Sequence, residues 1–276
     1  MNRLTTTLNQ LQRNGTKALG IFVTAGYPER EATDEILRCL DSAGVDFIEL
    51  GMPFSDPLAE GSTIQETSEV ALRNGVDLEF CLDAVSRFRQ KSDTPLLLMG
   101  YINPIYKFGV SNFCSRAASS GVDGLIIADL PYHESEFLRD HAETHGLSVV
   151  HLVTPNTSRN RIEEIDRAST GFVYAVSLIG LTGADIERGR EVDEYLTRLN
   201  ETVVNNRVLA GFGIRSRNDA NALAVHTDGV IVGSAFLKEV AASWVSFDSI
   251  EEKAKAVDAF VKSVRPTIGT TRVVER

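Results

Sequence analysis

Short apolar segments alternate with longer amphipathic segments along the whole chain. Aliphatic and β-branched residues dominate the short segments, which is typical of strands buried on both faces of a parallel sheet. Apolar residues recur at helical spacing between them, as in segments 30–42, 78–91, 135–144 and 190–205. The pattern predicts eight strands, at 19–24, 46–50, 95–100, 124–128, 148–153, 172–177, 207–211 and 229–232.

This alternation predicts an α/β fold whose parallel strands are joined by right-handed crossovers. Eight repeats favour a closed (β/α)8 TIM barrel over an open doubly wound sheet, and 276 residues suit one such barrel. Extra helices are expected at the N-terminus (2–14), inserted between the second and third strands, and at 247–264. No linker rich in Pro or Ser divides the chain, so residues 1–276 are expected to form one domain, with 267–276 as a frayed tail.

Charge and cysteine content narrow the class of protein. The chain has 28 Lys and Arg against 38 Asp and Glu, a net charge of -10 that disfavours nucleic acid and anionic membranes as partners. Cys39, Cys81 and Cys114 are scattered without metal-ligand spacing, as reduced thiols are in cytosolic proteins. The first residues lack a signal-peptide core and no apolar run could span a membrane, so we expect a soluble, cytoplasmic protein.

Glu49 is the most unusual residue of the predicted strands. Alternation places Ile48 and Leu50 on one side of the second strand and Glu49 on the other, inside an apolar run. Burial would raise the pKa of this carboxyl toward that of a useful general acid or base. The alternative is a carboxylate paired with a basic neighbour, but Arg207, at the edge of a strand, is almost the only basic residue in the strands. The functional interpretation is therefore favoured.

Active sites of such barrels lie in the loops that follow the strands. The loop after the second strand, 52–61, has two prolines and carries Asp56 and Glu60, and it is either a rigid surface turn or part of the site. Asp129 follows the fourth strand, where it could equally be a functional carboxylate or the N-cap of the next helix.

Glycine-rich loops follow the last three predicted strands. Gly211-Phe212-Gly213 and Gly233-Ser234 come after the seventh and eighth strands, where backbone N–H groups form the phosphate site of many barrels. We therefore predict phosphate binding there, although one such loop alone would be an ordinary turn. The segment 180–184 after the sixth strand is a candidate lid or a plain surface loop.

Two histidines, His141 and His145, stand one helical turn apart as in some zinc sites. Gly146 follows them directly, and they precede a strand instead of following one. A solvated helix end is the favoured interpretation.

The loop motifs together resemble the tryptophan synthase α-subunit family. The segment FIELGMPFSDPLA at 47–59 is similar to the long signature of that family, and the resemblance extends over nearly the whole chain. The other matching motifs, in the expected order, are TAGYP (24–28), YINP (101–104), DLP (129–131), YAVS (174–177), GLTG (180–183), GFGI (211–214) and GSA (233–235).

The resemblance implies retro-aldol cleavage of indole-3-glycerol phosphate to indole and glyceraldehyde 3-phosphate, without a metal or organic cofactor in this chain. By position, Glu49 matches the general acid/base, Glu60 the carboxylate that holds the indole N–H, and Tyr174 the active-site tyrosine. The remaining substrate and phosphate-binding positions it implies are Phe22, Tyr101, Asp129, Thr182, Gly183, Gly211, Phe212, Gly213, Gly233 and Ser234.

The resemblance also implies a partner. Asp56 and Pro57 match the contact with a β subunit, which receives the indole in an αββα complex and carries pyridoxal phosphate. An α subunit of this kind is expected to be weakly active alone. The alternatives are a free-standing indole-glycerol phosphate lyase and a catalytically weak subunit that regulates the β subunit.

The chain departs from the family pattern at its second carboxylate. Glu60-Gly61-Ser62 stands where Asp-Gly-Pro is usual. The extra methylene is enough to displace a hydrogen bond by about an ångström, and misplacement on that scale can lower a rate up to roughly a hundredfold.

Overall fold

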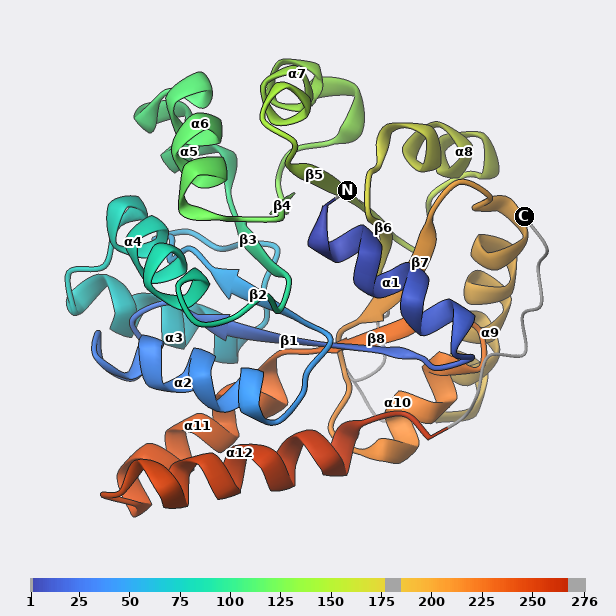
Figure 1. Cartoon of the computed structure of the whole chain (residues 1–276). Coiled ribbons are helices and arrows are strands. Elements are labelled where there is room, and N and C mark those ends of the chain that lie inside the picture. Colours follow the sequence, from blue (N-terminus) through green and yellow to red (C-terminus); the bar gives the residue numbers. More distant parts are fainter. Residues whose placement is uncertain (1, 177–184, 268–276) are drawn as a thin grey trace.

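Eight parallel strands close into a barrel in the computed structural model, which describes residues 2–176 and 185–267 (Figure 1). The strands follow one another around the barrel in chain order, and β1 pairs with both β2 and β8. The predicted (β/α)8 architecture is therefore confirmed. The strands are β1 (Ala18–Thr24), β2 (Phe47–Gly51), β3 (Leu96–Gly100), β4 (Gly124–Ile127), β5 (Ser148–Val153), β6 (Phe172–Val176), β7 (Arg207–Gly211) and β8 (Gly229–Val232).

Helices surround the barrel and include the expected additions at the N-terminus and between β2 and β3 (Figure 1). The helix expected at 247–264 begins later, because the Ser249 side chain caps it by accepting from the Glu252 backbone N–H. The helices are α1 (Arg3–Arg13), α2 (Ala32–Ser42), α3 (Ser62–Arg73), α4 (Leu78–Arg89), α5 (Ile102–Phe108), α6 (Val110–Ser120), η1 (Tyr132–Glu134), α7 (Glu136–Thr144), α8 (Arg159–Ala168), α9 (Asp185–Thr202), α10 (Arg217–Ala224), α11 (Ser234–Ser246) and α12 (Ile250–Val264).

Strand alternation divides the apolar residues between two cores. The outer core lies between strands and helices and includes Ile48 and Leu50, whereas the inner core fills the barrel. Inner residues include Phe22, Phe47, Leu97, Met99, Ile126, Val150, Phe172, Tyr174, Leu209 and Ile231. Alternate residues of the strands thus point to the barrel axis, and the alternation predicted for the second strand is confirmed.

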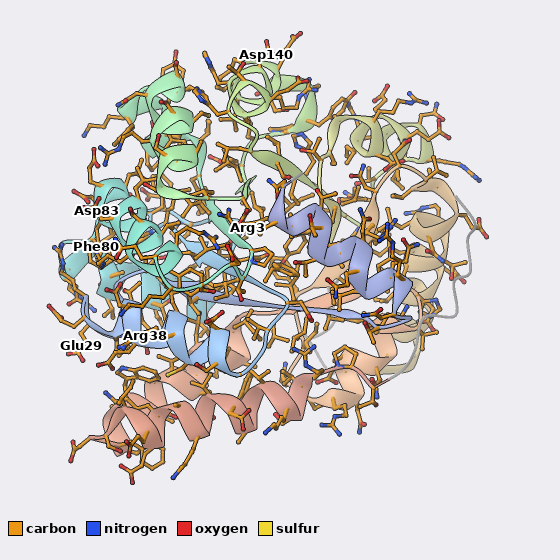
Figure 2. The ribbon with its side chains drawn as sticks, in the orientation of Figure 1. Arg3, Glu29, Arg38, Phe80, Asp83 and Asp140 are labelled. Carbon is orange, nitrogen blue, oxygen red and sulfur yellow. The ribbon has the colours of Figure 1, made fainter. Side chains whose placement is uncertain are left out.

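Helix α1 covers the amino-terminal end of the barrel (Figure 1). Its Leu4 and Leu8 are buried in the inner core. Arg3, labelled in Figure 2, pairs with buried Asp123 at 3.1 Å, and Arg89 pairs with the same carboxylate at 2.9 Å. Helix α1 therefore closes the barrel interior at this end, and the carboxyl-terminal end is where barrel enzymes hold their sites. The expected tail lies outside the described residues from 268 onward.

Candidate active site

Two buried carboxyl groups stand at the carboxyl-terminal half of the barrel. Glu49 on β2 is 0% exposed and Glu60, in the loop that follows, is 9% exposed. Both oxygens of Glu49 and Oε2 of Glu60 have no hydrogen-bond partner among the described residues. Burial, together with the charge of Glu60, raises the pKa of Glu49 well above its usual range, and burial raises the pKa of Glu60 to about 7. Glu60 can therefore exchange protons near neutral pH, and Glu49 holds its proton more tightly than an ordinary carboxyl group.

The position of Glu49 follows from the register of β2. Glu49 is aligned with Phe22 on β1 and Leu97 on β3, and both neighbours face the barrel interior. No basic side chain in the described part of the chain pairs with Glu49, so the alternative of a structural ion pair is not observed there. Arg207 lies at the other end of the barrel, where its guanidinium donates to the Asn9 and Gln12 side chains of α1.

Tyr174 on β6 lies in the same interior and is 3% exposed. Burial, and then the charges of Glu49 and Glu60, raise its pKa, so the phenol stays protonated. Gly211 makes room for this ring, since a Cβ there would lie 2.1 Å from Tyr174 Oη. Gly211 therefore has a packing role that its place in a glycine loop did not suggest.

The loop that carries Glu60 is held by its own hydrogen bonds. The Glu60 backbone N–H donates to the Pro57 carbonyl at 3.0 Å, and the Gln65 side chain donates to the Glu60 carbonyl at 2.9 Å. The Ala59 N–H donates to Tyr101 Oη at 3.1 Å. These contacts fix the backbone of Glu60 and leave its carboxyl free for a ligand.

The predicted partner-contact residues in this loop differ in exposure. Asp56 is exposed, whereas Pro57 is buried. Leu58, which sequence reasoning did not single out, is 89% exposed.

Asp129 is exposed and caps a helix, but not the helix that follows it. Its Oδ1 accepts from the Ile102 N–H at 2.9 Å, at the start of α5. Of the two alternatives left open for Asp129, capping of the following helix is not observed, because the carboxylate turns back to the β3 loop. Tyr101 is the N-cap residue of α5, and its ring stacks on Phe54 with 5.0 Å between centroids. Burial, with a smaller effect of Glu60, raises the pKa of Tyr101.

The two glycine loops after β7 and β8, predicted to bind phosphate, differ in local conformation. Phe212 and Gly213 both have φ of 80°, and for a residue with a side chain such as Phe212 this is uncommon. Gly233 is the N-cap residue of α11, and Ser234, its first residue, is exposed. The helix start directs N–H groups outward, as in anion sites. Thr182 and Gly183, predicted to contribute from the β6 loop, lie outside the described residues.

A cavity of about 280 Å³ opens at the carboxyl-terminal ends of the strands. Its wall includes Glu60 and Phe212, whereas Glu49 and Tyr174 lie in the packed interior. Tyr132 and His151 also line it, and sequence reasoning missed both. The complete lining is Ala59, Glu60, Met99, Ile127, Ala128, Leu130, Pro131, Tyr132, His151, Leu152, Thr154, Val176 and Phe212.

The remaining candidates take no part in this arrangement. His141 lies in the last turn of α7 and His145 is its C-cap residue, as a helix end predicts. Among residues 2–176 and 185–267, no group of three His, Cys, Asp or Glu side chains is placed to hold a metal ion. All three cysteines are buried and unpaired. No described helix is long and apolar enough to cross a membrane.

Comparison with known proteins places these features in one family. A family model described as "Tryptophan synthase alpha chain" matches residues 8–268. A chain of that name from Christiangramia forsetii is 41% identical over 96% of this chain and 99% of its own length, and one from Geobacter sulfurreducens is 40% identical over 98% and 100%. The solved subunit alpha from Legionella pneumophila superposes with a TM-score of 0.86 at 33% identity, covering 96% of this chain and 98% of its own. A structure of the a2b2 complex of Pyrococcus furiosus matches with a TM-score of 0.80 at 38% identity, covering 90% and 98%.

Proposed function

We infer the activity from the family: the chain belongs to the tryptophan synthase alpha chains, lyases that cleave indole-3-glycerol phosphate to indole and glyceraldehyde 3-phosphate. The observation that carries the assignment of roles is the unpartnered carboxyl of Glu49, buried in the barrel beside a second carboxyl at the cavity wall. A group without a protein partner is free to transfer a proton.

Glu49 is proposed as the general acid and base. In the retro-aldol step, the bond between indole C3 and the adjacent glycerol carbon breaks. C3 receives a proton from Glu49, and the hydroxyl on the glycerol carbon loses its proton to Glu49 as the aldehyde forms. The raised pKa of Glu49 favours the protonated form, which delivers the proton to carbon.

Glu60 and Tyr174 are proposed to orient the ring. The Glu60 carboxylate accepts the indole N–H and stabilises the positive charge that develops on the ring when C3 is protonated. Tyr174, neutral and fixed between Phe172 and Phe212 at centroid distances of 6.1 and 6.2 Å, holds the adjacent wall. Phe22 and Tyr101 are proposed to complete the ring pocket, while Asp129 anchors the start of α5.

The phosphate is proposed to bind backbone N–H groups of the β7 and β8 loops. Gly213, Gly233 and Ser234 supply the positions, and Gly211 lets the β7 loop pass beside Tyr174. Thr182 and Gly183 are proposed to add to this site from the β6 loop. Such a site binds a dianion without a basic patch, which suits a chain of net charge -10.

A β subunit is the proposed partner, as in the a2b2 complex of the Pyrococcus furiosus relative. The exposed loop with Asp56 and Leu58 beside the cavity supports a contact there, with Pro57 shaping the loop from inside. We propose that pyridoxal phosphate belongs to that partner, that this chain uses no cofactor of its own, and that it works in the cytoplasm. Nucleic acid and membranes are not proposed partners.

The test is indole release from indole-3-glycerol phosphate by the purified chain, with and without a β subunit. We expect slow release alone, faster release with the partner, and further improvement in Glu60→Asp, since that change restores the shorter carboxylate of the family. High activity alone and no complex in a pull-down would favour a free-standing lyase. No indole under any condition, with stimulation of the β reaction, would favour a regulatory subunit.

A further inference from the structure

The cavity proposed to hold the substrate is lined in part by the loop after β4 and by the end of β5. Glu60 and Phe212 line the same cavity from the loops after β2 and β7. We call the part of the lining at β4 and β5 the β4–β5 lobe. It consists of Leu130, Pro131, Tyr132, His151 and Thr154.

A network of side chains holds the wall of the β4–β5 lobe in place. Tyr132 Oη donates to Glu164 Oε2 at 2.5 Å, which ties the β4 loop to α8. The Arg161 guanidinium lies over the Tyr132 ring at 4.8 Å from its centroid. Ser135 Oγ donates to the Tyr132 carbonyl at 2.6 Å. The residues that line the β4–β5 lobe on this side are therefore held in place by specific contacts.

His151 supplies a polar group in this wall. It is 5% exposed, and its ring meets the edge of the Tyr132 ring at 6.5 Å. Its Nε2 lies 3.5 Å from Ser135 Oγ, at the limit of a hydrogen bond. Burial, with a contribution from Arg139, lowers the pKa of His151 to about 4. The imidazole is thus neutral, and a neutral ring nitrogen can donate or accept according to its tautomer.

The barrel topology places the lobe opposite the proposed phosphate loops. The strands are arranged in chain order around a closed barrel of eight, so β4 lies across the mouth from β8. A substrate with its phosphate at the β7 and β8 loops therefore directs its other end, the ring, toward β3, β4 and β5. With the ring N–H at Glu60, the carbocyclic edge of the ring is the part left to face the β4–β5 lobe.

We propose that the β4–β5 lobe is a specificity pocket for a small hydrogen-bonding substituent, a hydroxyl or an amino group, on the carbocyclic ring of indole, with His151 as its partner. This inference rests on the proposed function and adds to it the class of substituted ring that the cavity accepts. Tyr132 acts as a positioning residue, because its bond to Glu164 holds the wall against which His151 packs.

The test uses the reverse reaction, condensation of glyceraldehyde 3-phosphate with indoles. Each indole bearing one hydroxyl on the carbocyclic ring is compared with the corresponding methylindole, which has a similar size but no hydrogen bond. We expect the wild-type chain to prefer the hydroxyl in kcat/KM at one or more ring positions by about three- to tenfold, the effect of one neutral hydrogen bond. His151→Leu should remove that preference or reverse it, and Tyr132→Phe should weaken it.

Controls separate this inference from the proposed function. His141→Leu, a partly exposed histidine on α7 outside the cavity, should keep the wild-type preference. Failure to condense unsubstituted indole would contradict the proposed function alone. In that case the binding affinities of hydroxyindole and methylindole, measured by calorimetry in the presence of glycerol 3-phosphate, would still show whether the lobe prefers the hydroxyl group. No preference for hydroxyl at any ring position in the wild-type chain, or an undiminished preference in folded His151→Leu, overturns it.

Discussion

Replacing Glu60 by glutamine should make the chain more stable, and increasingly so as the pH rises. Glu60 is buried without a partner for Oε2, so ionising it in the folded chain leaves an uncompensated charge. Glutamine keeps nearly the same shape and cannot ionise. The free energies of unfolding of the two proteins should therefore differ mainly by the contribution of the charge on residue 60.

The size of the effect follows from the raised pKa. The pKa of Glu60 rises from 4.5 to about 7 on folding, so the folded chain binds the proton more tightly than the unfolded chain. A carboxyl of this kind favours the folded state below the unfolded pKa, and this contribution is lost as pH rises through the folded value. A shift of roughly 2.5 units at about 1.36 kcal/mol per unit gives about 3 kcal/mol lost between about pH 4 and about pH 8. This is a large share of the stability of an ordinary domain.

Glu49 adds to the effect with the same sign. The charge of Glu60 helps to raise the pKa of Glu49, so removing that charge also eases ionisation of Glu49 at high pH. Both consequences favour the variant over wild type above neutral pH.

The assay is urea unfolding of the wild-type chain and Glu60→Gln at a series of pH values. Titrations that the two proteins share cancel in the difference, so the stability advantage of the variant should grow by about 3 kcal/mol from about pH 4 to about pH 8. Glu66→Gln, an exposed carboxylate on neighbouring α3, reports any general effect of removing an acidic residue. A pH-independent difference would contradict the reasoning. If the free energy of unfolding of the variant instead falls relative to that of the wild-type chain at high pH, Glu60 must be paired when it is charged.

Three further substitutions test the site. Glu49→Gln should lower cleavage by about a hundredfold or more while substrate-analogue binding stays within about tenfold in calorimetry, and equal loss of both would make Glu49 structural. Gly211→Ala places a Cβ 2.1 Å from Tyr174 Oη, so we expect a lower kcat and a free energy of unfolding in urea that is lower by about 1–3 kcal/mol. An unfolding curve identical to that of the wild-type chain would show that the tyrosine ring can move without cost. Gly233→Asp should raise the Michaelis constant at least about tenfold by adding a carboxylate at the start of α11, and an unchanged constant in steady-state kinetics would refute that phosphate position.

The barrel fold and the inward-facing position of Glu49 could be predicted because both depend on local periodicity. Runs of four to seven apolar residues separated by amphipathic segments are the direct consequence of strands buried on both faces. Within β2, alternation alone decides that Glu49 faces the barrel interior. Because the strands contain almost no basic residues, an ion pair with Glu49 was not expected. In the structure Arg207 indeed lies at the opposite end of the barrel.

The cavity wall at Tyr132 and His151 could not be predicted in this way. His151 aligns with Val173 on the helix-facing side of the strands, so alternation assigns it to the outer core. It nevertheless lines the cavity together with Tyr132 of the β4 loop, and Tyr132 is bonded to Glu164, 32 residues away. The bond from Ile102 to Asp129 likewise spans 27 residues, and no local pattern reveals it.

The burial that makes Glu60 costly in the free chain also suits its proposed role. A carboxylate held in an apolar wall interacts strongly with a nearby positive charge, because little water screens the pair. The indole ring has almost no such charge in the substrate and gains it only when C3 is protonated. The interaction is then stronger in the transition state than in the bound substrate, which is the condition for raising kcat. The chain therefore loses stability at Glu60 near neutral pH for the same reason that cleavage is accelerated. In both cases the cause is an acidic group that is buried away from solvent and has no partner for Oε2 within the described chain.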